Sequence, residues 1–193
     1  NGNRRFKSYG TACIRVSGTG VGGNGALVNT GASGNNAFTD QINLLGDTTI
    51  GGTARFDIDG TITTTASGVT VTKVGSSQVV LAGNNDAASI SNFVVNSGIL
   101  QFENHDGGGN AHVTVNSGGI LRAWIGADGT RRVDNDVTLN GGRIDGIGTR
   151  TTARYDGTVS VTADSVIDPN NNLRAIELAG TLTGSGKIDF GNG

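Results

Sequence analysis

Two pairs of aspartates have the spacing that places both carboxylates on one face of a β-strand. Asp57 and Asp59 lie in a stretch of alternating apolar and polar residues, and Asp134 and Asp136 repeat that spacing. Paired carboxylates can bind calcium or act as the acid and base of polysaccharide cleavage. Neither pair lies beside an obvious basic partner motif, so a solvated face is the favoured interpretation, and no catalytic residue is assigned.

Two histidines flank a glycine-rich turn. His105 and His112 are seven residues apart, and Gly107-Gly108-Gly109 lies between them. A zinc site needs a third ligand at a suitable spacing, which this segment does not offer. The turn also lacks the aspartate of a calcium-binding nonapeptide repeat. We therefore expect surface histidines, and we predict neither a metal site nor a cofactor.

Trp124 and Cys13 each have two interpretations. Trp124, the only tryptophan, ends the apolar stretch that begins at Ile120. It could be an exposed platform for stacking sugars, but a core position is favoured because large aromatic side chains usually pack inside. Cys13 has no recognisable nucleophile motif around it. A small buried or edge residue is therefore expected there in place of a reactive thiol.

The segment Gly18–Gly23 matches the G-x-G-x-x-G spelling of a dinucleotide-binding loop. That function needs a helix directly after the loop, whose N-terminus holds the pyrophosphate. The following residues, 24–31, are rich in glycine and asparagine and do not predict a helix. With glycine this abundant, the match is expected by chance.

A cluster of arginines between residues 122 and 154 alternates with aspartates. A nucleic-acid site would carry charge of one sign and stacking aromatic residues. The mixed charge predicts a ladder of ion pairs along the molecule and no nucleic-acid partner. The residues are Arg122, Arg131, Arg132, Arg143, Arg150 and Arg154, with Asp128, Asp134, Asp136 and Asp145.

The composition indicates which kinds of secondary structure can position these residues. Glycine accounts for 34 of 193 residues, with one proline, one cysteine and no methionine. This excludes collagen, a disulfide scaffold and a mostly helical protein. No apolar run approaches the roughly 18 residues of a membrane span, so no membrane insertion is expected. A net charge of -2 with 35% hydrophobic residues does not fit a disordered chain.

Short Val-, Ile- and Leu-rich stretches, separated by Gly, Asn, Asp and Ser, predict many strands and few helices. Units of 20 to 25 residues recur: Val95 matches Val115, and Leu100 matches Ile120, on a 20-residue spacing. Ile42–Ile50 matches Val159–Ile167 in a longer echo at an offset of 117. Such a unit buries its apolar face only by stacking on its neighbours.

The predicted fold is therefore all-β, a parallel β-helix (β-solenoid) of about eight or nine coils and roughly 40 Å in length. Residues 1–193 are treated as one β-helix domain, with residues 1–25 as a basic N-terminal segment and first coil. Glycine and asparagine suit its tight corners, and threonine suits its solvent-facing positions. An antiparallel β-sandwich is the competing interpretation.

Residues 71–101 resemble the autotransporter-associated β-strand repeat. The resemblance rests on Thr72-Lys73-Val74-Gly75, on Val79-Val80-Leu81-Ala82-Gly83-Asn84 and on Val95-Asn96-Ser97-Gly98-Ile99-Leu100. Ser77 stands where that family usually has glycine. The resemblance implies a right-handed parallel β-helix in the passenger region of an exported bacterial surface protein. It carries no catalytic residue to transfer.

The two ends of the chain differ in charge. Arg4, Arg5, Lys7 and Arg15 precede the first acid, Asp40, whereas acids exceed bases in the remainder. Residues 181–193, which include Asp189 and Phe190, resemble an open coil more than a polar cap. Opposite charges on uncapped ends would permit head-to-tail stacking of copies. Alternatively, the chain is a slice of a longer β-helix whose neighbouring coils cover both ends.

The expected function is that of a non-enzymatic structural protein, exported to the bacterial surface or the extracellular space. It would act as a rigid stalk, an adhesin-like passenger that contacts glycans or cell surfaces, or a fibre-forming subunit. Because the chain contains no methionine, we expect a processed product or an excised part. The alternative is a polysaccharide-binding or polysaccharide-cleaving β-helix. Asp57, Asp59 and a basic residue clustered in one groove would favour this second class.

Overall fold

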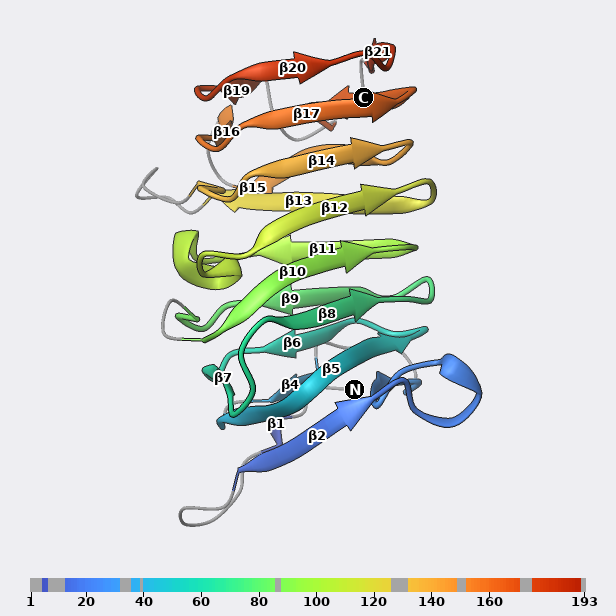
Figure 1. The fold of residues 1–193 in the computed structure, drawn as a ribbon, viewed down its shortest axis with the longest axis vertical. Coiled ribbons are helices and arrows are strands. Elements are labelled where there is room, and N and C mark those ends of the chain that lie inside the picture. The colour runs from blue at the N-terminus through green and yellow to red at the C-terminus, as the bar shows by residue number, and fades with distance from the viewer. Residues whose placement is uncertain are drawn as a thin grey trace.

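The chain winds into a stack of short parallel strands, a β-solenoid (Figure 1). The computed structural model describes residues 5–6, 13–31, 36–38, 40–85, 88–125, 132–148, 152–170 and 175–191. Successive coils lie one above another along the long axis, from β2 at one end to β20 and β21 at the other. The strand pairings between named elements are all parallel, so the antiparallel sandwich is wrong.

Two long sheets make the walls of the solenoid. The nine strands of the first sheet are, in spatial order, β1 (Arg5–Phe6), β4 (Asn36–Phe38), β6 (Phe56–Ile58), β9 (Gln78–Leu81), β11 (Gly98–Phe102), β13 (Gly119–Ile125), β15 (Arg143–Gly148), β18 (Ser165–Asp168) and β21 (Ile188–Phe190). The main path of the second sheet is β2 (Ile14–Gly18), β5 (Ile42–Gly52), β8 (Val69–Lys73), β10 (Ile90–Val95), β12 (His112–Asn116), β14 (Val137–Asn140), β17 (Val159–Ala163) and β20 (Leu182–Gly184).

The remaining elements are short. β3 (Leu27–Asn29) and β7 (Ile62–Thr64) pair with β5, and β16 (Thr152–Tyr155) pairs with β19 (Ala175–Leu178) in a small third sheet. Two 3-10 helices, η1 (Val21–Gly23) and η2 (His105–Gly108), lie in connections between strands.

The stack contains about six turns, so the prediction of eight or nine coils is too high. Along the second sheet, six steps lead from β5 to β20. Paired residues on successive strands are 20 to 24 positions apart over these steps.

A ladder of inward-facing side chains forms the core. In β8, for example, Val69 and Val71 are buried, whereas Thr70 and Thr72 between and after them are only half-buried. Each coil then covers the apolar residues of the next, which stabilises the stack by roughly 25 cal/mol per Å² of apolar surface buried. Phe93 and Phe102 come from facing sheets and meet edge to face, with ring centroids 5.8 Å apart.

The register between coils agrees with part of the sequence repeat and corrects the rest. Val95 pairs with Val115 as predicted. Leu100, however, pairs with Leu121 and not with Ile120. The extra residue is Gly118, which lies in the turn before β13 with φ +88° and whose carbonyl accepts a hydrogen bond from the Gly98 N–H.

The longer echo is wrong as a structural equivalence. Following the pairings from strand to strand places Thr48 in line with Val159, whereas the echo had aligned Ile42 with that residue. The similar apolar spacing matches Ile42–Ile50, which lies within β5, to a segment that begins in β17 of the second sheet and ends in β18 of the first.

Glycines mark the corners, where backbones of adjacent coils come close. A Cβ at Gly83 would lie 2.3 Å from the carbonyl oxygen of Gly60, one coil below. A Cβ at Gly180 would lie 2.3 Å from the carbonyl oxygen of Gly157. The spaced glycines of the sequence therefore allow coils to stack at the β-sheet distance.

Candidate functional site

The outer face of the first sheet carries a ladder of ion pairs, as the alternating charges predict. Arg122 lies on β13, and its Nε and Nη2 each donate to a different oxygen of Asp145 on the adjacent strand, both at 2.7 Å. Arg143 pairs with Asp168 at 3.0 Å and lies 3.5 Å from Asp145. The hydrogen bond to Asp145 raises the pKa of Arg122. Arg131, Arg150 and Asp128 lie outside the described residues.

Asp145 is fully buried even though it lies on the outer face of its strand. Below it, in the interior, the hydroxyl of buried Tyr155 lies 2.6 Å from the Asp145 carbonyl oxygen and 3.1 Å from that of Leu121. Burial raises the pKa of Tyr155 well above its usual value. The Asp145 carboxylate is therefore paired with Arg122, and the Asp145 carbonyl oxygen accepts a hydrogen bond from Tyr155. Both contacts hold β15 in its place in the first sheet.

Asp57 belongs to a second charged group on the same sheet. Arg55 Nε donates to Asp57 at 2.7 Å, and Arg55 Nη2 reaches Glu103 at 3.2 Å. Asp59 is half-buried and is not one of the partners of this group. The two aspartates are therefore not assembled as a carboxylate pair, although a basic residue does accompany Asp57.

Asp134 and Asp136 line a cavity of about 240 Å³ together with His112 and residues 109–111 and 135. Asp134 accepts a hydrogen bond from Arg132 at 2.6 Å, and Asp136 accepts one from the Thr158 N–H at 2.7 Å. The arrangement is polar and open to ligands, but each carboxylate already has a partner within the solenoid.

The two histidines do not come together. His105 contacts Asp106 at 2.8 Å, whereas the Nε2 of His112 lies 2.9 Å from the Thr138 hydroxyl. Within the described ranges, no group of three or more His, Cys, Asp or Glu side chains is arranged to hold a metal ion.

Trp124 is not in the core, so the favoured interpretation of this residue is wrong. It follows buried Ala123 in β13 and is only partly buried. Alternation along the strand turns it to the outer side, like Arg122. Cys13 is also partly buried, next to the first residue of β2. Gly18–Gly23 contains η1 at its end and is followed by β3, without the α-helix that a dinucleotide site requires.

The outer face of the second sheet is different in character. One row of paired residues, half-buried or exposed except for buried Thr49, is made of hydroxyl side chains and a single valine: Thr49, Thr72, Val94, Thr114, Thr138, Ser160 and Thr183. Beside it, Asn140 donates to Asn116 at 2.9 Å, and Asn116 donates to Asn96 at 2.8 Å. Threonines thus lie on this outer face, as expected, and asparagines hydrogen-bond from coil to coil beside them.

Sequence reasoning missed a buried lysine. The Lys73 side chain points into the interior and is 2% exposed, and its Nζ donates to the carbonyl oxygens of Val74, Gly75 and Ser97 at 2.9, 2.9 and 3.0 Å. Burial lowers the pKa of Lys73 to about 8. The alternation of β8 indicates this burial: Lys73 lies an even number of residues after Val69 and Val71, whose side chains point inward, so its side chain points inward too.

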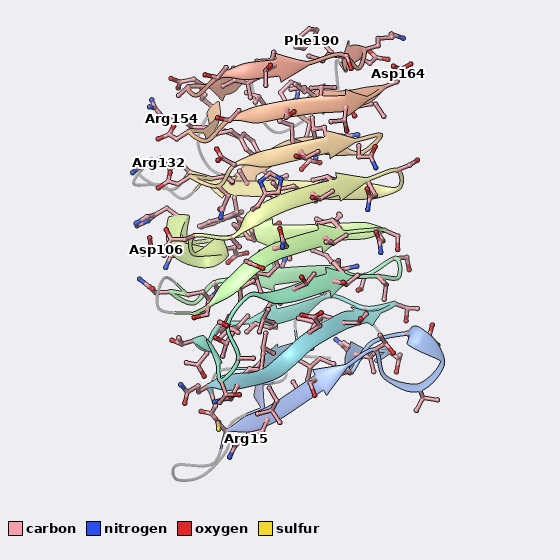
Figure 2. The ribbon with its side chains drawn as sticks, in the orientation of Figure 1. Arg15, Asp106, Arg132, Arg154, Asp164 and Phe190 are labelled. Atoms are coloured by element: carbon pink, nitrogen blue, oxygen red, sulfur yellow. The ribbon has the colours of Figure 1, made fainter. Side chains whose placement is uncertain are left out.

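The last coil exposes residues whose counterparts in the adjacent coil are buried. Leu182 pairs with buried Val159 but is itself 41% exposed, and Phe190 pairs with buried Ile167 but is 69% exposed. Figure 2 shows Phe190 and Asp164 at one end of the stack and Arg15 at the other.

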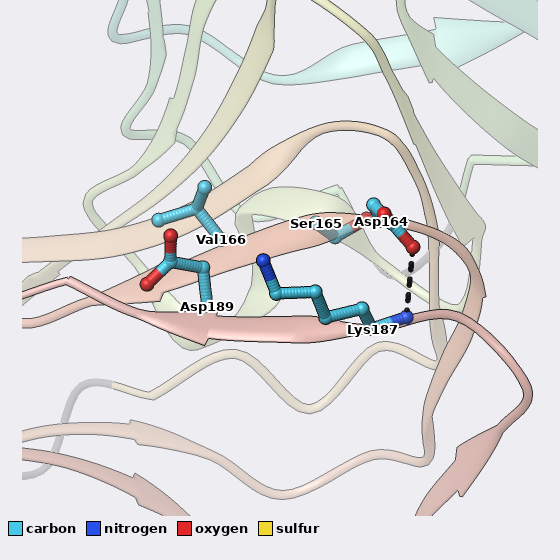
Figure 3. Close-up of a pocket in the computed structure, with 5 residues that line it drawn as sticks. All are labelled: Asp164, Ser165, Val166, Lys187 and Asp189. Carbon is cyan, nitrogen blue, oxygen red and sulfur yellow. Dashed lines mark hydrogen bonds between the residues drawn. The ribbon is translucent and has the colours of Figure 1, made fainter.

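The predicted end residues are placed in part. Asp189 lies on exposed β21, and Arg5 begins β1 at the opposite edge of the same sheet. Arg4 and Lys7 lie outside the described residues. Figure 3 shows Asp189 with Asp164, Lys187 and two further residues around a hollow of about 150 Å³. There the Lys187 N–H donates to the Asp164 carboxylate at 3.1 Å.

Comparisons with family models, with curated proteins and with solved structures give no match for this chain. None of the helices in the described part of the chain has the length and apolar character needed to cross a bilayer.

Proposed function

We propose that this chain is a structural, non-enzymatic segment of an exported bacterial surface protein, built as a right-handed β-solenoid. It acts as a rigid stalk, as an adhesin-like passenger or as a subunit of a fibre. The observation that carries the proposal is the inner ladder, which runs from coil to coil among the described residues and reaches exposed Leu182 and Phe190. Such a stack is lengthened by adding coils at its end.

The charged residues support the same proposal. The arginines of the first sheet are joined to aspartates on neighbouring strands, as in the pair of Arg122 with Asp145. These side chains tie adjacent coils together and strengthen the wall. A resemblance of residues 71–101 to the autotransporter-associated repeat supports the surface location.

The second candidate is a polysaccharide-binding or polysaccharide-cleaving protein, and the cavity beside His112, Asp134 and Asp136 favours it. Hydrogen-bonding side chains around a hollow of this size could hold a sugar. The first proposal remains stronger because both aspartates already serve structural contacts.

One titration separates the two functions. Backbone amide NMR spectra are recorded while oligosaccharides from a panel of bacterial and host polysaccharides are added, and the mixtures are assayed for cleavage products. A structural segment gives no product and no saturable shift at Asn110, His112 or Asp136. Saturable shifts confined to these residues, or released product, would establish the second candidate.

A further inference from the structure

The two ends of the stack are complementary edges of the same two sheets. The first sheet runs from β1 to β21 and the second from β2 to β20, with parallel pairing throughout. The strand at each end has one paired edge and one edge without a partner among the described strands. Because every strand in a sheet points the same way, the last strand of one copy can pair with the first strand of another without reversing direction.

The residues at these edges are partly exposed core residues. Ile14 and Val16 of β2 pack against the core from one side only and are half-buried. At the other end, Leu182 and Phe190 are exposed. Each end therefore offers apolar positions and unpaired backbone groups together, which is the usual liability of an uncovered sheet edge.

The register of such a contact follows from the stack itself. One continuous row of paired residues passes through all eight strands of the main path of the second sheet: Gly18, Thr48, Val71, Phe93, Val113, Val137, Val159 and Leu182. If the row continues in a straight line, Leu182 of one copy lies over Gly18 of the next. A Cβ at Gly18 would meet nothing within 4 Å, so this position has room for the leucine side chain.

The charges at the two ends also favour a head-to-tail contact between two copies of the chain. The first 39 residues carry four basic and no acidic side chains, and Arg15 is exposed at this end. The opposite end exposes Asp164 and Asp189 beside one lysine, Lys187, whereas exposed Glu177 is paired with Arg154. Complementary ends attract and identical ends repel, which selects head-to-tail contacts over symmetric ones.

We propose that a second copy of this chain docks on the last coil, with β20 pairing with β2 in the register that sets Leu182 over Gly18. The inference rests on the proposed structural function and names the partner of its open end. It is a heterologous contact, so it repeats and builds a filament in which the inner ladder continues from copy to copy.

Cross-linking tests the register. In a Cys13→Ser background, Ser17→Cys and Thr181→Cys place thiols on facing residues of two docked copies, because these residues precede Gly18 and Leu182. Mild oxidation should give a ladder of covalent oligomers. The matched control combines Ser17→Cys with Thr158→Cys, whose second position lies one coil inside the stack. A ladder from the control, or none from the test variant, overturns the register.

Sedimentation velocity tests the partner. The 193-residue chain should form larger species as concentration rises, and moderate salt should weaken that growth. Leu182→Asp should weaken association about a hundredfold or more, because it buries a carboxylate in the contact. Thr183→Asp, on the outer side of the same strand, should retain it. A chain that stays monomeric while small-angle scattering shows the intact solenoid shape overturns this inference and leaves the structural function standing.

Discussion

Replacement of Lys73 by methionine should remove one specific component of the pH dependence of stability. The Lys73 ammonium lies inside the solenoid and donates to three carbonyl oxygens from two coils. Methionine keeps most of the apolar stem but has no donor. The substitution relieves the cost of burying a charge, yet removes three charge-assisted hydrogen bonds to half-buried carbonyl oxygens, of which, in the described part of the chain, only that of Gly75 keeps another donor, the Ser97 hydroxyl. Each lost bond costs about 1–3 kcal/mol. We expect a net loss of about 1–3 kcal/mol at pH 7.

The pH profile gives the sharper test. The pKa of Lys73 falls from 10.5 to about 8 on folding. Between these pH values the unfolded chain holds a proton that the folded chain has released, so stability rises with pH in this window. At about 1.4 kcal/mol per pKa unit, the wild-type protein gains up to roughly 3 kcal/mol from this group. The Lys73→Met variant lacks the gain, so its deficit should widen by that amount.

Urea unfolding followed by far-UV circular dichroism between pH 7 and pH 10.5 measures this difference. Subtracting the two stability curves removes the contribution of Tyr155 and other groups common to both proteins. Lys187→Met is the matched control, since Lys187 is exposed. Its difference curve should be flat. A flat curve for Lys73→Met as well would refute the placement of a buried lysine at this corner.

Two further substitutions test the corners and the ion ladder. Gly83→Ala should lower stability by roughly 2–4 kcal/mol because the new Cβ would lie 2.3 Å from the Gly60 carbonyl oxygen, whereas Gly46→Ala, with nothing within 4 Å, should be close to neutral in thermal unfolding. Equal effects at both glycines would contradict the close approach of the coils. Arg122→Ala strips the main partner from a fully buried carboxylate and should cost about 3 kcal/mol, against less than about 1 for the exposed Arg132→Ala, by urea unfolding. Similar losses for the two arginines would show that burial does not distinguish these pairs.

The alternation of residues predicted the walls of the solenoid well. Val113 and Val115 face inward and Thr114 faces outward, as period-two patterning requires. The Arg–Asp ladder could be anticipated too, because opposite charges recur about one coil apart, as Arg122 and Asp145 do. These features depend only on residue parity and on the length of a coil.

The parts that could not be predicted depend on single residues in turns and on contacts between coils. Gly118 shifts the pairing of Leu100 by one residue, and nothing in the apolar pattern reports this insertion. The parity of Lys73 indicates an inward side chain, but its acceptors include Ser97 from the next coil. The size of Trp124 favours the core, but its place in the alternation of β13, next to buried Ala123, is the better guide.

The coil register underlies every proposal, and through-space NMR contacts between backbone protons test it most directly. The structure predicts contacts between strands of successive coils along the row of Val71, Phe93, Val113 and Val137, residues 20 to 24 positions apart. Contacts of this kind in every coil would establish the parallel stack. Contacts between neighbouring strands in antiparallel hairpins, with partners only a few residues apart at each turn, would contradict it.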